Sequence, residues 1–245
     1  MSKLSAAVPQ VSIILPALTV NSDYLRCLYS IRAALSGKVS YEIISIVRDI
    51  KAFTNLASPD LRIFLEEGPG IYRAMNLGID RAAGEYIYFI GQDDILLPDA
   101  AASVVRGSAR EADVILANVF WGSGRIHRNY VLRQSLVWTN WCHQGVFYKR
   151  TVFVKIVGSF PLEYKAQADH YSNIVLSTNR TVRVVKYNGC IAWYSATGFS
   201  TQSPDLVFRA AFPGLVREHF GLISYCSVKL RRALLKCIKL MLKAK

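Results

Sequence analysis

The sequence lacks the features that mark several common protein classes. Its five cysteines are scattered and never spaced Cys-x-x-Cys, which argues against a disulfide framework or a zinc site and fits a reducing compartment. No stretch approaches the roughly 20 apolar residues that span a bilayer, and residues 1–10 lack the apolar core of an export signal. The glycine-rich patterns of P-loop and dinucleotide-binding folds are also absent. We therefore expect neither an exported nor an integral membrane protein.

Charged residues are few and mostly of one sign. They make up 19% of the chain, with 30 Lys and Arg against 17 Asp and Glu, for a formal net charge of +13. Nucleic acid and an anionic membrane surface are the two candidate partners for such an excess. The chain carries no recognisable nucleic-acid-binding motif, and its basic residues do not alternate with stacking aromatics. We therefore expect no nucleic acid partner.

Apolar runs alternate with helical spacings along the first half of the chain. The runs predict strands over residues 11–16, 41–47, 61–65, 86–90 and 114–120. Helical spacing predicts helices over residues 22–35, 71–83 and 99–109, the first of them capped by Ser22 or Asp23. This alternation is typical of βαβ units, so the expected class is α/β, with a Rossmann-like, mostly parallel central sheet flanked by helices.

The most informative stretch is residues 85–97. A buried strand is predicted up to Ile90, and Asp93 and Asp94 follow just after Gly91. In an open α/β sheet, ligands bind at the carboxyl ends of the strands. Paired carboxylates at that position suit Mg²⁺ or Mn²⁺, which favour carboxylate, water and phosphate oxygens. For the Asp-Asp pair alone, a solvated turn is the alternative interpretation.

The C-terminal segment, residues 205–245, holds more than half of the positive excess, with a net charge of about +7. On a helical wheel of residues 228–243, five basic residues share one arc: Lys229, Arg232, Lys236, Lys239 and Lys243. The opposite arc carries Leu230, Leu234, Leu235, Ile238, Met241 and Leu242. Such a basic amphipathic helix can lie at an anionic membrane surface. The alternative is a helix that packs on the domain with a solvated basic face.

Several motifs occur in an order that resembles the inverting glycosyltransferases of family 2. Residues 70–79 resemble the family signature Gly-Ile-Tyr-Asp-Ala-Met-Asn-Lys-Gly-Ile, and residues 83–87 with the Asp93-Asp94 turn resemble the element that follows it. Downstream, four further segments resemble the His-Gln-x-x-Phe-Tyr, Gly-x-Phe, Ala-Asp-Tyr-Asp and Gly-Gly-x-Ser elements: residues 143–150, 158–160, 168–171 and 198–200. The resemblance is closest to bacterial members that build surface polysaccharide or lipopolysaccharide.

The resemblance implies a GT-A fold and a division of the chain. Residues 1–204 would form the transferase domain, with a nucleotide-sugar-binding half over about 9–100 and an acceptor half over about 101–204. Residues 205–245 would form a basic helical tail. The implied protein is cytoplasmic and peripherally associated with the cytoplasmic face of the inner membrane.

The resemblance also implies roles for individual residues. Asp93 would hold the cation, with Asp94 as a second ligand, direct or through water. Asp169 would be the general base, although the start of its own predicted helix is another use for that carboxylate. Further residues would bind the donor: Pro16, Asp49, Tyr72, Asn76, Gln92 and Asp93. Tyr72 and Asn76, four apart on one helix face, could equally pack that helix on the sheet.

His143 and Gln144 lie beside two tryptophans, which favours contact with the acceptor sugar, against the alternative of a purely structural histidine. The implied donor is a nucleotide-diphosphate sugar, with UDP favoured and GDP or dTDP possible. The implied acceptor is a hydroxyl of a lipid-linked or surface glycan.

Three positions depart from the family pattern. Arg73 replaces an aspartate, Gly91 replaces the first aspartate of an Asp-x-Asp turn, and Gly68 replaces another acidic residue. These losses of acidic residues leave open an alternative function, that of a catalytically inactive partner subunit for another transferase. A basic nucleic-acid-binding protein is a more distant alternative.

Overall fold

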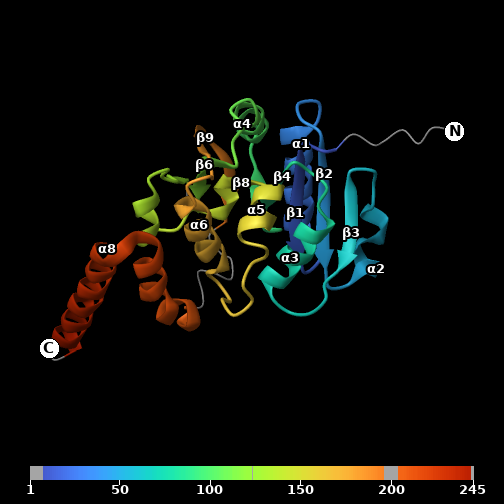
Figure 1. Ribbon diagram of the computed structural model, residues 1–245. Coiled ribbons are helices and arrows are strands. Elements are labelled where there is room, and N and C mark those ends of the chain that lie inside the picture. The colour runs from blue at the N-terminus through green and yellow to red at the C-terminus, as the bar shows by residue number, and fades with distance from the viewer. Residues whose placement is uncertain (1–7, 123, 196–203, 244–245) are drawn as a thin grey trace.

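The computed structural model describes residues 8–122, 124–195 and 204–243. A central sheet has helices on both faces, and the C-terminal helix α8 extends away from it, at the opposite end from β3 (Figure 1). The strands are β1 (Val11–Ala17), β2 (Tyr41–Val47), β3 (Leu61–Leu65), β4 (Tyr86–Phe89), β5 (Ile95–Leu96), β6 (Val114–Trp121), β7 (Arg125–His127), β8 (Val146–Lys149) and β9 (Val184–Tyr194). The helices are α1 (Ser22–Leu35), α2 (Ile50–Phe53), α3 (Ile71–Arg81), α4 (Asp99–Ser108), α5 (Arg150–Ile156), α6 (Ala168–Thr178) and α8 (Leu206–Lys243).

The sheet has the order β3-β2-β1-β4-β8-β6-β9-β5, with β7 paired to β6. The first four strands in this order are parallel. Strand β8 then runs antiparallel to β4 and β6, while β9 is parallel to β6. The carboxyl ends of β1, β2 and β4 therefore meet at one edge, where open α/β sheets bind ligands. The expected α/β class with a Rossmann-like sheet is confirmed.

The hydrophobic core lies in two layers, one on each face of the sheet. Helices α1 and α4 cover one face, and α3, α5 and α6 cover the other. Strand β1 is buried along its whole length because its side chains alternate between the layers: Ile13 packs into the first and Ile14 into the second. This double burial explains why the central strands are continuous apolar runs in the sequence.

The element boundaries agree closely with the sequence predictions, with small differences at the helix ends. The cap of α1 is Asn21, whose Oδ1 accepts a 2.9 Å hydrogen bond from the Tyr24 amide, so the prediction of Ser22 or Asp23 was wrong. Helix α3 ends at Arg81, because Ala82 already has an extended backbone.

Helix α8 consists of two limbs that meet at Gly221. This glycine has φ +83°, a left-handed conformation that breaks the helical path and that other residues adopt only with strain. Phe208 on the first limb is buried in the core layer of α3, α5 and α6, so this limb packs with the domain. The domain boundary expected at residue 204 stays a prediction.

The second limb, residues 222–243, has an exposed apolar face. Leu230, Leu234, Ile238 and Leu242 are all half or more exposed, with Leu242 at 71%. Among the described residues, no helix is long and apolar enough to cross a membrane.

Candidate functional site

The ends of β1 and β4 are joined by a side-chain contact. Gln92, in the turn after β4, accepts a 2.6 Å hydrogen bond through its Oε1 from the backbone amide of Leu18, which follows β1. Pro16 lies buried near the end of β1. The structure thus brings Pro16 and Gln92 to the same edge of the sheet. Asp49 lies exposed after β2, where its carboxylate caps α2 through the Lys51 amide at 3.0 Å.

Asp94 is a buried carboxylate, only 1% exposed, that holds three segments together. Its Oδ2 accepts hydrogen bonds from the Gly91 amide at 3.1 Å and from the Gln144 side-chain amide at 2.8 Å. Its Oδ1 accepts from the Ser195 amide at 3.1 Å. Burial raises the pKa of Asp94 to about 6, against the lowering effect of the Gln144 bond. With both oxygens engaged inside the protein, Asp94 is better placed to act through water than as a direct ligand, and its role as a second metal ligand stays a prediction.

Asp93 is partly exposed at the same turn and accepts a hydrogen bond from the Ser195 hydroxyl. Gly91 has a steric reason to be glycine. A Cβ added at Gly91 would lie 2.9 Å from Asp93 Oδ1 and 3.0 Å from Asp94 Oδ2. The family pattern has an aspartate at position 91. In this chain, the two carboxylates occupy the space that its side chain would need.

We expect Gly91→Ala to displace the Asp93 and Asp94 carboxylates, because the new methyl group would overlap both. The expected result is a tenfold or greater loss of nucleotide affinity, which corresponds to about 1.4 kcal/mol, measured by calorimetric titration. Gly214→Ala is a control for the loss of a glycine away from the site, since its backbone is not at positive φ and an added Cβ there meets nothing within 4 Å. Wild-type affinity in Gly91→Ala would show that nucleotide binding does not need the close approach of the two carboxylates to Gly91.

A second carboxylate, Asp169, lies in the first turn of α6 and is 8% exposed. The Tyr72 hydroxyl of α3 donates to its Oδ1 at 2.8 Å, and the Asn140 side-chain amide donates to its Oδ2 at 2.7 Å. The Nδ1 atom of His143 lies 3.8 Å from Oδ2. The site at the start of α6 is therefore assembled from three distant parts of the chain.

The electrostatics around Asp169 favour its charged form. Burial acts to raise the pKa of Asp169, but the neighbouring His143 and the Tyr72 hydroxyl together lower it below its usual value. The pKa of Tyr72 is raised well above its usual value, by burial first and then by the negative charge of Asp169. Asp169 is thus a carboxylate at neutral pH, and Tyr72 is a neutral donor to it.

The two carboxylate sites are connected through adjacent residues. Gln144 bonds to Asp94, and His143, the preceding residue, faces Asp169. Gln144 is itself fixed, since its backbone oxygen accepts a 2.6 Å bond from the Tyr88 hydroxyl of β4. The short helical turn of residues 143–145 therefore sets the turn after β4 and the start of α6 in fixed relation to each other.

The remaining predicted residues are placed as follows. Both ends of the Asn76 amide bond to the backbone of Phe160, at 2.9 and 2.8 Å, which favours the packing alternative for this residue. Tyr72 faces Asp169 rather than the turn after β4. Arg73 is exposed and lies beside Gly68, where an added Cβ would be 3.4 Å from the arginine Cδ. Residues 198–200, which resemble a family element, lie outside the described residues.

Two residues of the site were not predicted from the sequence. Asn140 bonds to Asp169 and is held in turn by Asn173 at 2.9 Å. Ser195 contacts both Asp93 and Asp94 from the end of β9. In the sequence, the feature that could have pointed to Asn140 is its position as a polar residue between Trp138 and Trp141. The residues next to Ser195 in the sequence give no sign of its role, because its contacts arise only when β9 pairs with β5 and β6.

The residues present fit a divalent cation held mainly by substrate. Within the described ranges, no three His, Cys, Asp or Glu side chains gather as a ready-made cage. Mg²⁺ commonly binds through one or two carboxylates, with phosphate oxygens and water completing its shell. Asp93, partly exposed at the strand end, can supply such a carboxylate, whereas Asp94 is buried and engaged by other donors.

Comparison with known proteins identifies the family. Residues 12–162 match the family model "Glycosyl transferase family 2". A "PGL/p-HBAD biosynthesis glycosyltransferase" of Mycobacterium bovis is 30% identical over 236 residues, which cover 89% of each chain. The putative glycosyltransferase EpsH of Bacillus subtilis is 31% identical over 121 residues, covering 45% of this chain and 33% of that protein.

Solved structures share the fold at low sequence identity. S. aureus TarS 1-349 in complex with UDP-GlcNAc has a TM-score of 0.67 at 16% identity, covering 86% of this chain and 67% of that one. The mannosyltransferase PcManGT of Pyrobaculum calidifontis, in complex with GDP-Man and Mn²⁺, has a TM-score of 0.59 at 14% identity, covering 91% and 64%. Together with the family match over more than half of its length, these findings establish that this chain belongs to glycosyl transferase family 2 and is a glycosyltransferase with a GT-A fold.

Proposed function

We propose that the chain is a metal-dependent, inverting glycosyltransferase. It would move a sugar from a nucleotide-diphosphate sugar to a hydroxyl of a lipid-linked or surface glycan acceptor. The observation that carries the proposal is the connection from Asp94 through Gln144 and His143 to Asp169. It joins the turn that carries Asp93, a partly exposed carboxylate that could hold a diphosphate through a cation, to a second carboxylate suited to accept a hydroxyl proton.

In this proposal the donor lies at the edge formed by β1, β2 and β4. Asp93, Gln92, Pro16 and Asp49 all lie at the carboxyl ends of these strands. A bound Mg²⁺ or Mn²⁺ would neutralise charge on the leaving diphosphate, and Asp93 would hold it. Solved relatives in complex with UDP-GlcNAc or with GDP-Man and Mn²⁺ support a nucleotide-sugar donor. We favour UDP among the possible nucleotides, with GDP and dTDP as alternatives.

Asp169 would act as the general base. The acceptor oxygen attacks the anomeric carbon as the bond to the diphosphate breaks; the bonding electrons leave with the diphosphate, and the hydroxyl proton passes to Asp169. A carboxylate has about four acceptor positions, so the bonds from Tyr72 and Asn140 leave room for the acceptor hydroxyl. Tyr72 and Asn140 would then orient the base rather than react.

The test is turnover of donor by the purified chain. UDP-, GDP- and dTDP-sugars are incubated separately with Mg²⁺ or Mn²⁺, and release of the nucleoside diphosphate is measured. We expect release from one nucleotide class, faster with acceptor present, and none after chelation of the metal. A folded protein that releases no nucleotide from any donor would instead support the inactive partner subunit.

We also propose that the protein associates peripherally with the cytoplasmic face of the inner membrane, through the second limb of α8. Its exposed apolar face and its basic residues are the two components that bind an amphipathic helix to an anionic surface. Each basic residue near such a surface contributes about 1 kcal/mol.

Deletion of residues 225–245 should move the protein from the membrane to the soluble fraction, because it removes most of the exposed apolar face. In the full chain, Ile238→Ser with Leu242→Ser should have the same direction of effect in a vesicle flotation assay. Ala233→Ser is the matched control, because Ala233 lies outside the apolar arc of the same helix. Unchanged flotation of both altered proteins would overturn the proposed association.

A further inference from the structure

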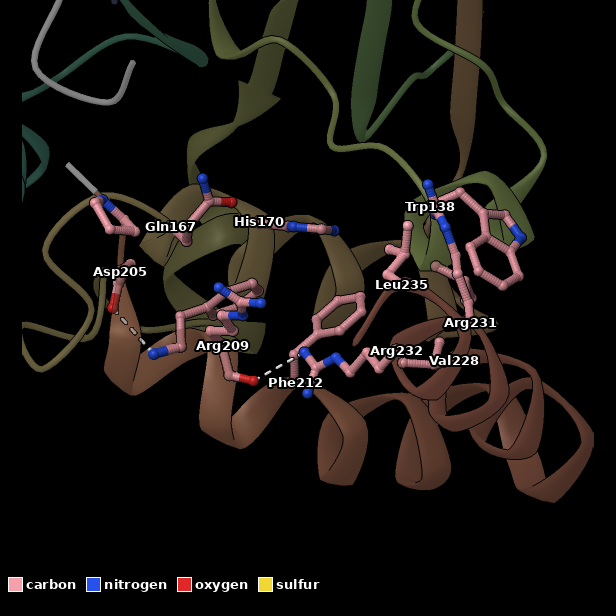
Figure 2. Close-up of a pocket in the computed structure, with 13 residues that line it drawn as sticks. Trp138, Gln167, His170, Asp205, Arg209, Phe212, Val228, Arg231, Arg232 and Leu235 are labelled. Atoms are coloured by element: carbon pink, nitrogen blue, oxygen red, sulfur yellow. Dashed lines mark hydrogen bonds between the residues drawn. The ribbon is translucent and has the colours of Figure 1, made fainter. Parts of the chain in front are cut away.

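A groove of about 400 Å³ lies between the two limbs of α8, the start of α6 and the turn at Trp138. Its walls are largely apolar: Val137, Phe208 and Phe212 on one side, Val228 and Leu235 on the second limb. Figure 2 shows the side chains of both limbs converging here, with His170 of α6 and Gln167, the residue before α6, on the far side. The groove is separate from the turn after β4 and is not used by the transfer chemistry proposed above.

Three arginines, Arg209, Arg231 and Arg232, line this groove. In the part of the chain that the structure describes, none of them has a carboxylate within salt-bridge distance. The one acidic residue in the lining, Asp205, is engaged elsewhere: its carboxylate accepts from the Phe208 and Ala166 amides. The groove therefore carries a net positive charge, from three arginines against one aspartate.

Two of the three arginines, Arg231 and Arg232, are held in place by the protein. The Arg231 guanidinium lies 5.3 Å from the centre of the Trp138 ring, and Arg232 donates a 2.9 Å hydrogen bond to the Arg209 carbonyl. Desolvation first, and the nearby charge of Arg209 second, lower the pKa of Arg232 from its usual value. Like charges held together beside apolar walls are stabilised when an anion lies between them, and guanidinium groups bind phosphate in a bidentate manner.

The groove continues directly into the exposed apolar face of α8. Leu235 is in the lining, and Ile238 and Leu242 follow it at helical spacing of three and seven residues. An occupant with an anionic group at one end and an apolar chain at the other would satisfy both features at once. An acidic peptide would leave the apolar face uncovered.

We propose that this groove binds the phosphate headgroup of one anionic phospholipid, whose acyl chains lie along the apolar face of the second limb of α8. The proposal rests on the proposed membrane association and deepens it, because it replaces a diffuse attraction with a defined headgroup site. The groove borders residues 167 and 170, on either side of Asp169. A lipid held there would orient the start of α6 toward the membrane surface.

The test uses dihexanoyl phosphatidylglycerol below its micelle concentration, titrated into the full chain. Binding is followed by calorimetry and by tryptophan fluorescence, with Trp138→Phe identifying the Trp138 contribution. We expect saturable binding, a change in Trp138 fluorescence, and affinity at least tenfold higher than for dihexanoyl phosphatidylcholine or inorganic phosphate. Arg209→Gln with Arg231→Gln should weaken this binding at least tenfold.

The matched control is Lys229→Gln with Lys236→Gln, which removes the same charge from α8 outside the groove lining. Wild-type affinity in the control, with loss in the arginine variant, supports the headgroup site. Equal weakening in both would indicate a diffuse charge effect, and equal binding of inorganic phosphate a free-phosphate site; either result overturns the proposal. If wild-type protein floats with anionic vesicles while the arginine variant binds the short lipid normally, the groove proposal fails and membrane association survives.

Discussion

Asp169→Asn should lower kcat by about 10²–10⁴-fold, the usual contribution of a general base. Asparagine keeps the size of the side chain and an oxygen that can accept from Tyr72, but it cannot take the proton of the acceptor hydroxyl. The donor site at the turn after β4 would be untouched, so nucleotide affinity should remain at the wild-type value. Initial rates at saturating donor, together with calorimetric titration of the nucleotide, measure the two effects separately.

Tyr72→Phe is the companion variant for this prediction. It removes one hydrogen bond to Asp169 and leaves the carboxylate in place, so we expect a smaller loss of kcat than in Asp169→Asn. The thermal unfolding midpoint of both variants shows whether they are folded. If Asp169→Asn is folded and keeps more than about a tenth of wild-type kcat, Asp169 is not the base.

Asp94→Ala and Asp93→Ala should separate the two adjacent carboxylates sharply. Loss of Asp94 leaves three donors without their acceptor: the buried side-chain amide of Gln144 and the partly buried backbone amides of Gly91 and Ser195. Each unsatisfied buried group costs about 1–3 kcal/mol, partly offset because a buried charge is also removed. We expect the free energy of unfolding to fall by about 2–4 kcal/mol, which lowers the unfolding midpoint by roughly 5–15 °C.

Asp93→Ala should behave differently, because Asp93 is partly exposed and does not bridge the Gln144 segment. We expect a near wild-type unfolding midpoint and the loss of metal-dependent nucleotide binding. Differential scanning calorimetry of the two variants measures the contrast directly. Equal midpoints for Asp94→Ala and the wild type would show that the Asp94 hydrogen bonds are not a structural link.

The sequence was sufficient to predict the parallel part of the sheet, because strands buried on both faces are continuous apolar runs. Residues 41–47 correspond to β2, which is buried along almost its whole length. Residues 61–65 correspond to β3, a partly exposed edge strand whose apolar residues still marked its position. The second half of the sheet was harder to predict from the sequence. Strand β9 mixes buried and partly exposed positions, so its pattern has no clear period, and its pairing with β6 joins segments about 70 residues apart.

The candidate site shows the same division between local and long-range information. The sequence predicted carboxylates at the end of β4, but their different environments depend on Gln144 and Ser195, which come from distant segments. The helical wheel of residues 228–243 predicted the amphipathic face of α8. The helical wheel did not predict the bend at Gly221, where the backbone has a positive φ. Nor did it predict the groove, which forms because the two limbs pack against Trp138 and α6.

The central claim is that the turn after β4 binds the diphosphate of a donor with a divalent cation. The most direct measurement is calorimetric titration of UDP, GDP and dTDP, each with and without Mn²⁺, into the wild type and Asp93→Ala. We expect one nucleotide, with UDP favoured, to bind the wild type only when Mn²⁺ is present, and this binding to be lost in Asp93→Ala. Failure of all three to bind the folded wild type, or equal binding by Asp93→Ala, would contradict the account.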